Sequence, residues 1–280
     1  MTSESPASSD RSTALRRGLL FLVATSPIWL VPKRFPVFHP IAMLGVVLGA
    51  TLLFLWWDKR SPSELGLELS WRPPVYLLGG LLGGALLMAV IVVLLHAVLP
   101  FDWAYNPAFI WRFSLASLGY LIIANCVEEL LFRGYAFERL ITSIGLWPAQ
   151  LIVALLFATY HLLNGYTWQV AFTGSVIGSV MFGLVFVRTR SVIAATGFHA
   201  VTNWARDLLL ADPPTMKTWF GPVAGRNWTP AERQTTMIVF NGAALLVCAL
   251  LYWSIRRRDR KLAAGDTRAD RRKAERVLAK

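Results

Sequence analysis

The sequence predicts an all-α protein, a polytopic membrane helical bundle of about eight transmembrane helices. Of its 280 residues, 55% are hydrophobic and 16% are charged, whereas roughly 25% of the residues in ordinary soluble domains are charged. A soluble globule does not bury that much apolar surface. The net charge of +12 does not indicate a nucleic-acid partner, because nucleic-acid binders of this charge are polar. The two cysteines, Cys126 and Cys248, lie in apolar runs and exclude a disulfide scaffold.

Eight apolar runs approach or reach the length of about 20 residues that crosses the hydrocarbon core. Charged or Pro- and Gly-rich breaks separate them, such as the Asp58-Lys59-Arg60 turn after the second run. The third run contains Gly79-Gly80 and Gly83-Gly84, a pattern suited to close helix packing. The predicted spans are Gly18–Val31, Val37–Trp57, Pro74–Leu99, Phe113–Leu140, Pro148–Asn164, Trp168–Val187, Ser191–Ala211 and Gln234–Ile255.

The distribution of Lys and Arg predicts that both termini are cytoplasmic. With that orientation, 20 Lys and Arg lie on the cytoplasmic side and 6 on the other, the asymmetry expected of a membrane protein. We expect a disordered tail over 1–17, a membrane domain over 18–255 and a basic cytoplasmic tail over 256–280. That last segment holds 11 Lys and Arg and is expected to lie along anionic lipid headgroups. The chain is thus predicted to be a multi-pass cell-membrane protein, and its Arg-rich style favours a bacterial plasma membrane.

Two carboxylates lie deep inside the fourth apolar run. An ionisable side chain at mid-membrane depth costs several kcal/mol and usually marks function. Glu129 and Arg133 are spaced i, i+4, which predicts an ion pair on one helix face. Glu128 lies about 100° around the helix and has no such partner, so it is free to act as a general base.

Three further polar residues lie at a similar depth. His161 lies in the fifth predicted span, and His199 and Asn203 lie one turn apart in the seventh. At about 1.5 Å per residue, His161, His199 and Glu128 all lie roughly 12–20 Å from the expected cytoplasmic ends of their helices. The region of about 113–211 is therefore expected to carry a site near the middle of the membrane.

These residues fit hydrolysis of a peptide bond inside the membrane. Glu128, oriented by His161 or sharing a proton with it, can deprotonate a water molecule. His199 and Asn203 can donate hydrogen bonds to the oxyanion that forms. Glu128, His161 and His199 also form a possible zinc-binding set, which would activate the water instead. The sequence leaves the metal open.

Three motifs in this region resemble those of the CPBP family of CAAX-processing and bacteriocin-processing intramembrane proteases, of the CAAX prenyl protease 2 or Abi type. The resemblance covers about Ala116 to Asp207. It implies an eight-helix bundle with a catalytic cavity open toward the cytosol, and a membrane-embedded or lipidated protein or peptide as substrate. The motifs read Glu128-Glu129…Arg133, Phe157…His161 and His199…Asn203.

The resemblance leaves two mechanisms open, a glutamate-type protease and a metalloprotease. We favour the metal-free mechanism, because Asn203 replaces a third strong metal ligand and suits an oxyanion hole. Two other classes of function remain alternatives. A proton-coupled transporter would use the buried Glu, Arg and His as a relay, and a non-catalytic membrane scaffold or immunity protein would use them to join helices.

Overall fold

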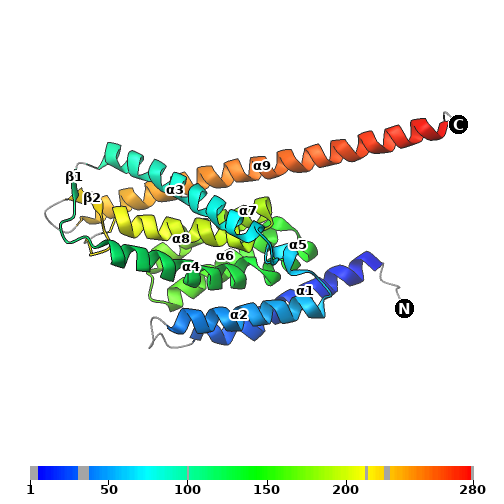
Figure 1. The fold of residues 1–280 in the computed structure, drawn as a ribbon, viewed down its shortest axis with the longest axis horizontal. Helices are drawn as coiled ribbons and strands as arrows, with labels where there is room; N and C mark the ends of the chain where they lie inside the picture. Colours follow the sequence, from blue (N-terminus) through cyan, green and yellow to red (C-terminus); the bar gives the residue numbers. More distant parts are fainter. Residues whose placement is uncertain (1–5, 31–37, 100, 212–213, 224–227, 279–280) are drawn as a thin grey trace.

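A computed structural model describes residues 6–30, 38–99, 101–211, 214–223 and 228–278. The chain folds into a bundle of long helices with one short strand pair at one end (Figure 1). The helices are α1 (Pro6–Thr25), α2 (Phe38–Trp57), α3 (Arg72–Val98), α4 (Trp111–Arg133), α5 (Tyr135–Ile144), α6 (Leu146–Leu163), α7 (Val176–Thr189), α8 (Val192–Leu209) and α9 (Pro230–Leu278). Shorter elements are η1 (Ser26–Leu30), η2 (Pro62–Leu65), the π-helix η3 (Val170–Ser175), and strands β1 (Asp102–Tyr105) and β2 (Phe220–Val223).

The predicted all-α membrane bundle is confirmed. Within the described residues, six segments are long and apolar enough to cross a membrane: Pro40–Trp57, Arg72–Val98, Trp111–Ile144, Leu146–Leu163, Val170–Thr189 and Pro230–Ala264. α1 and α8 are not among them. α8 is more polar because it carries His199 and Asn203 inside the bundle and the exposed Arg206 near its C-terminal end. The count of eight spans and the cytoplasmic termini stay predictions.

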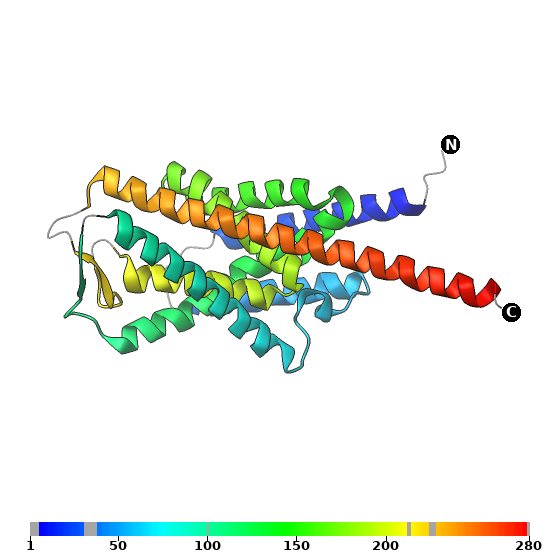
Figure 2. The same ribbon diagram turned by 90° about the horizontal axis from the view of Figure 1, so that it is seen from above.

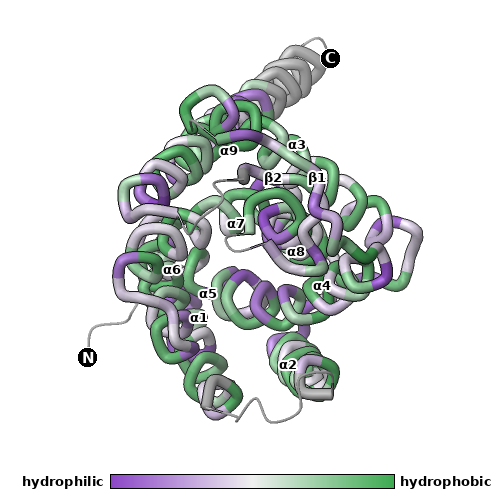
Figure 3. Tube along the Cα trace, turned by 90° about the vertical axis from the view of Figure 1, so that its left-hand side faces the viewer, coloured by the Kyte–Doolittle hydropathy of each residue, from purple (hydrophilic) through white to green (hydrophobic). Residues whose placement is uncertain are grey.

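α8 occupies the centre of the bundle and packs against α3, α4 and α7, as the end-on view in Figure 3 shows. Glycines allow α3 and α8 to approach closely. A Cβ on Gly80 would clash with the carbonyl oxygen of Ala194, and a Cβ on Gly197 would clash with the carbonyl oxygen of Leu77. The small-residue patch predicted for close packing therefore holds the central helix in place.

Two predicted boundaries are wrong. The expected span Phe113–Leu140 is interrupted at Gly134, where the chain turns from α4 into α5; a Cβ there would clash with the carbonyl oxygen of Leu130. The tail predicted to be disordered over 1–17 is helical from Pro6 onward, because Ala14 is buried against the bundle and Arg17 forms an ion pair with Asp58. Residues 1–5 of that tail lie outside the described part, as do residues 31–37 after the first helix.

The strand pair joins two connections far apart in the sequence. β1 follows α3 and β2 precedes α9, and they pair antiparallel with Asp102 opposite Val223 and Tyr105 opposite Phe220. The sequence analysis did not predict this sheet. It fixes one end of the bundle, next to the C-terminal end of α8 and the N-terminal end of α9.

A network of charged groups closes the opposite end. Asp58 accepts hydrogen bonds from Tyr135 at 2.7 Å and from Arg139 at 3.3 Å, and its side chain is only 3% exposed. Glu138 is contacted by Arg60 at 3.0 Å, Arg139 at 2.9 Å and Arg190 at 3.7 Å. Through the Arg17–Asp58 ion pair the network also joins α1 to the ends of α2, α5 and α7. We call this end of the bundle the basic end.

α9 continues well past the other helices at the basic end (Figures 1 and 2). Its backbone is helical to Leu278, so most of the predicted basic tail, 256–280, extends this helix. Arg258 fixes α9 to the end of α7 by donating to the carbonyl oxygens of Val187 at 3.3 Å and Arg188 at 3.2 Å. The start of α1 lies at the same end of the bundle (Figure 2).

Candidate functional site

A buried triad lies between α4 and α8. The predicted ion pair is present: Nη1 of Arg133 lies 3.4 Å from Oε1 of Glu129, and both side chains are 0% exposed. The same carboxylate oxygen lies 2.8 Å from Nδ1 of His199. Glu129 thus faces two partners, one on its own helix and one on the central helix. A carboxylate in this position fixes the orientation of an imidazole ring.

Aromatic rings enclose this triad. The guanidinium of Arg133 lies 4.3 Å from the centroid of the Phe157 ring and 5.5 Å from that of Phe182. The Phe182 ring also stacks on His199, with 4.0 Å between the ring centroids and 22° between the planes. These contacts are favourable for a buried cation and hold the imidazole between Phe182 and Glu129.

Glu128 occupies a different environment from its neighbour. Its side chain is 16% exposed, and its Oε2 lies 4.0 Å from Nε2 of His199. Because the Nδ1 side of the ring faces Glu129, the Nε2 side is the one presented to Glu128. The sequence analysis placed Glu128 beside His161; the structure also places it near His199.

His161 lies at the C-terminal end of α6. Its Nδ1 is 2.9 Å from the carbonyl oxygen of Phe157, which can only accept, so Nδ1 carries the proton and Nε2 is left without one in the neutral ring. Glu128, His199 and Arg133 are the charged groups near enough to act on His161 electrostatically. A direct hydrogen bond between His161 and Glu128, one of the predicted arrangements, is not formed among the described residues.

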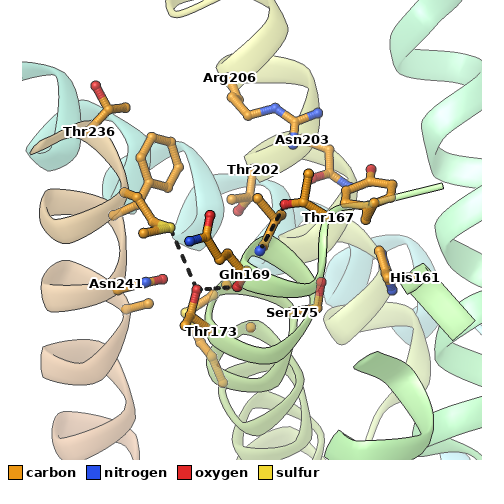
Figure 4. A pocket seen from close by; sticks show the side chains of 18 of the residues that line it. His161, Thr167, Gln169, Thr173, Ser175, Thr202, Asn203, Arg206, Thr236 and Asn241 are labelled. Carbon is orange, nitrogen blue, oxygen red and sulfur yellow. Dashed lines mark hydrogen bonds between the residues drawn. The ribbon is translucent and has the colours of Figure 1, made fainter. Parts of the chain in front are cut away.

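A cavity of about 960 Å³ adjoins these residues. His161, His199 and Asn203 line it, and Figure 4 shows His161 and Asn203 at one side of it. Glu128, Glu129 and Arg133 do not line it. Of the buried triad Glu129, Arg133 and His199, only His199 therefore lines the cavity.

The cavity lies toward the end of the bundle that carries the strand pair. Its exposed lining residues include Trp168, Arg206, Arg233 and Gln234, which lie before η3, late in α8 and at the start of α9. The basic end lies opposite. If the basic end is cytoplasmic, as the charge distribution predicts, the cavity opens away from the cytosol. In this fold, cytoplasmic termini are therefore incompatible with a cavity that opens toward the cytosol.

The metal-binding set predicted as possible does not come together. In the part of the chain that the structure describes, no group of three or more His, Cys, Asp or Glu is placed to hold a metal ion. Nδ1 of His199 faces Glu129 and Nδ1 of His161 faces a backbone carbonyl, which leaves Nε2 of each ring available as a ligand. As described, however, these groups are not gathered around one point, and the chemistry below is derived from the side chains alone.

Several contributors to the site were missed by the sequence analysis. Phe182 and the polar side chains of η3 and α9 lie outside the three motifs, and only packing brings them to the cavity. One signal was present: Asn241 is a polar residue inside the apolar run Pro230–Ala264, which is typical of a functional position.

Comparison with known proteins identifies the region that holds the site. Residues 110–205 match the family described as type II CAAX prenyl endopeptidase, Rce1-like. This match confirms the resemblance inferred from the three motifs, and it extends from the start of α4 into α8. No curated protein and no solved structure gives a significant match.

Proposed function

Because residues 110–205 form an Rce1-like CAAX protease domain of a membrane endopeptidase family, we propose that this chain hydrolyses a peptide bond of a membrane-associated protein or peptide at the cavity beside His199. The substrate class is a membrane-embedded or lipidated segment, in keeping with the prenyl endopeptidase family. The observation that carries the proposal is the position of His199, with Glu129 2.8 Å from Nδ1, Glu128 4.0 Å from Nε2, and the cavity alongside.

In the proposed reaction, Glu128 is the general base. Its carboxylate takes a proton from water, and the water oxygen bonds to the carbonyl carbon, which leaves negative charge on the carbonyl oxygen. His161 presents its unprotonated Nε2 and orients the water. When the tetrahedral intermediate collapses, the C–N bond breaks and the protonated Glu128 returns its proton to the leaving nitrogen. Glu128 therefore ends the cycle as it began.

His199 and Asn203 stabilise the oxyanion in this scheme. Asn203 donates from its amide nitrogen, and His199 donates from Nε2 when the ring carries a proton on each nitrogen, since Nδ1 faces Glu129. Donors fixed before the reaction are worth several kcal/mol in comparable sites. Glu129 and Arg133 are positioning residues, because they hold the imidazole and touch no reacting atom.

Substitution of Glu128 tests the proposal. Purified protein in liposomes is assayed with a peptide that ends in a farnesylated CAAX sequence, and membrane proteomes are compared between cells that carry the unmodified protein and cells that carry Glu128→Gln. We expect Glu128→Gln to lose at least a hundredfold in cleavage rate and to accumulate uncleaved species. Asp102→Asn, an exposed carboxylate in β1, is the matched control and should retain activity. Full activity of Glu128→Gln would refute the mechanism.

Chelation tests the choice between side-chain and metal chemistry. We expect phenanthroline to leave cleavage by the purified protein unchanged. Loss of activity that zinc restores would instead favour the metalloprotease alternative, with Glu128, His161 and His199 as ligands after a rearrangement of the described geometry.

A further inference from the structure

Four amide side chains line the cavity. Gln169 precedes η3, Asn203 lies in α8, and Gln234 and Asn241 lie in α9. Figure 4 shows Gln169 and Asn241 on opposite walls, with the amide of Gln169 extending toward α9. Within the described residues, none of the four side chains has a hydrogen-bond partner. Elsewhere the amides of Asn106 and Asn164 donate to backbone carbonyl oxygens, whereas the buried amide nitrogen of Asn125 has no hydrogen-bond partner among the described residues.

The lining of this cavity is mostly apolar, and its polar groups carry no negative charge. No Asp or Glu is among the residues that line it, and its two arginines, Arg206 and Arg233, lie at the mouth. The lining combines the four amides with hydroxyl groups such as those of Thr173 and Thr202, and with apolar walls. Such a surface suits an uncharged ligand that has both donors and acceptors.

Asn241 is a half-buried amide on the α9 side of this cavity. It lies in the segment Pro230–Ala264, whose mean hydropathy is 2.0, where an amide side chain is costly unless it finds a partner. The facing residue on η3 is Gly174, and a Cβ there would have the Asn241 Oδ1 as its nearest neighbour, at 4.0 Å. Thr173 joins the walls by donating to the Gln169 carbonyl oxygen at 2.7 Å and contacting the Met237 sulfur at 3.6 Å. The π-helical turn of η3 is typical of functional positions.

We propose that Gln169 and Asn241 form a subsite that binds the backbone of an extended peptide next to the bond that is cleaved. This inference rests on the proposed function and adds that the substrate binds as an extended peptide. A peptide unit that has left its helix inside a membrane needs partners for its N–H and C=O groups, each costing several kcal/mol if unsatisfied. A side-chain amide supplies one donor group and one acceptor, and two amides on opposite walls hold one peptide unit from both edges. α9, which carries Asn241, lies outside the matched region 110–205.

Binding of N-methylated peptides tests the subsite. The probe is a fluorescein-labelled peptide ending in a farnesylated CAAX sequence, and its binding to the purified full chain carrying Glu128→Gln is followed by fluorescence polarisation. Three further peptides each carry an N-methyl group at one of the peptide bonds after the farnesylated cysteine. We expect one of them to bind about tenfold more weakly, the upper range for one neutral hydrogen bond.

Substitutions on α9 and before η3 identify the side chain that binds the peptide backbone. We add Asn241→Leu or Gln169→Leu to the Glu128→Gln protein. Each double variant is expected to bind the parent peptide up to about tenfold more weakly. One of the two is expected to bind the parent and the N-methylated peptide equally well. Gly242→Ala is the control, because a Cβ there meets nothing within 4 Å. A purely structural role of Asn241 or Gln169 would lower affinity for all four peptides and keep their ratio.

The outcomes separate this inference from the proposed hydrolysis. Binding with discrimination, together with a lack of cleavage by the unmodified protein, would refute the hydrolysis and support the subsite. Cleavage of the peptide with unchanged affinity in both leucine variants would refute the subsite and leave the hydrolysis standing. Lack of binding of the parent peptide by the Glu128→Gln protein would also overturn the subsite.

Discussion

The Nδ1 atom of His199 lies 2.8 Å from Oε1 of Glu129, although 70 positions separate the two residues in the chain. This contact joins the central helix α8 to α4, and it leaves the Nε2 side of the ring facing Glu128 and the cavity. The two adjacent glutamates therefore have different surroundings: Glu129 is fully buried beside Nδ1 of His199, and Glu128 is partly exposed near Nε2 of the same ring.

The first prediction concerns the buried ion pair. Glu129→Ala should destabilise the protein by about 3–5 kcal/mol, because Arg133 would be left as a buried charge without a counter-ion. Thermal unfolding in detergent measures this. The double substitution Glu129→Leu with Arg133→Met should recover much of the stability, since both charges are then absent, but not the activity. A Glu129→Ala protein as stable as the unmodified chain would contradict the prediction.

The second prediction concerns the packing of α3 on α8. Gly84→Val should destabilise the bundle by about 2 kcal/mol or more, because the added side chain would meet Val201 and the backbone of Phe198. Gly79→Ala is the control in the same helix, since a Cβ at Gly79 meets nothing within 4 Å. Unfolding curves of the two variants in one detergent provide the comparison, and equal stability would refute the close approach.

The third prediction concerns pH and the loop that precedes α3. The hydrogen bond from Arg60 holds the pKa of Glu64 below its usual value. A lowered pKa in the folded state adds stability above the unfolded pKa of about 4.3, and this stability is lost as the pH falls through the folded value. Glu64→Gln should therefore flatten the acid side of the stability curve below about pH 4.5. Identical acid profiles for the two proteins would contradict it.

The fourth prediction concerns the membrane face on which the cavity opens. Lys217→Cys lies near the strand pair and Leu69→Cys near the basic end, and both positions are exposed. Both variants are made in a background without Cys126 and Cys248, and a membrane-impermeant maleimide is added to intact cells. The Lys217→Cys protein should be labelled in intact cells, and the Leu69→Cys protein only after permeabilisation. This pattern is expected because Lys and Arg concentrate on the cytoplasmic side. The reverse pattern would place the cavity on the cytosolic side and both termini outside.

Local spacing was sufficient to predict part of the site and of the fold. The i, i+4 pair of Glu129 and Arg133 and the small residues Gly80 and Gly84 follow from helix geometry alone, and both have their expected partners. The family resemblance likewise follows from three local motifs and is confirmed over 110–205.

Features set by tertiary packing were not predictable from spacing. The contact of His199 with Glu129 depends on how α8 lies against α4. The break at Gly134 was hidden because apolar residues continue on both sides of it. The strand pair joins β1 and β2, whose pairing partners are more than 100 residues apart, and no pattern within either strand indicates the other.

The attachment of α9 at the basic end has a mechanical consequence. Arg258 fixes this helix to the end of α7, while Gln234 lines the cavity near its other end. At about 1.5 Å per residue these two positions are roughly 36 Å apart, so a change of about 5° in helix tilt about Arg258 displaces Gln234 by roughly 3 Å. A mismatch between an apolar helix and the bilayer thickness is accommodated partly by helix tilt. A change in bilayer thickness that tilts α9 would therefore move Gln234 at the cavity mouth.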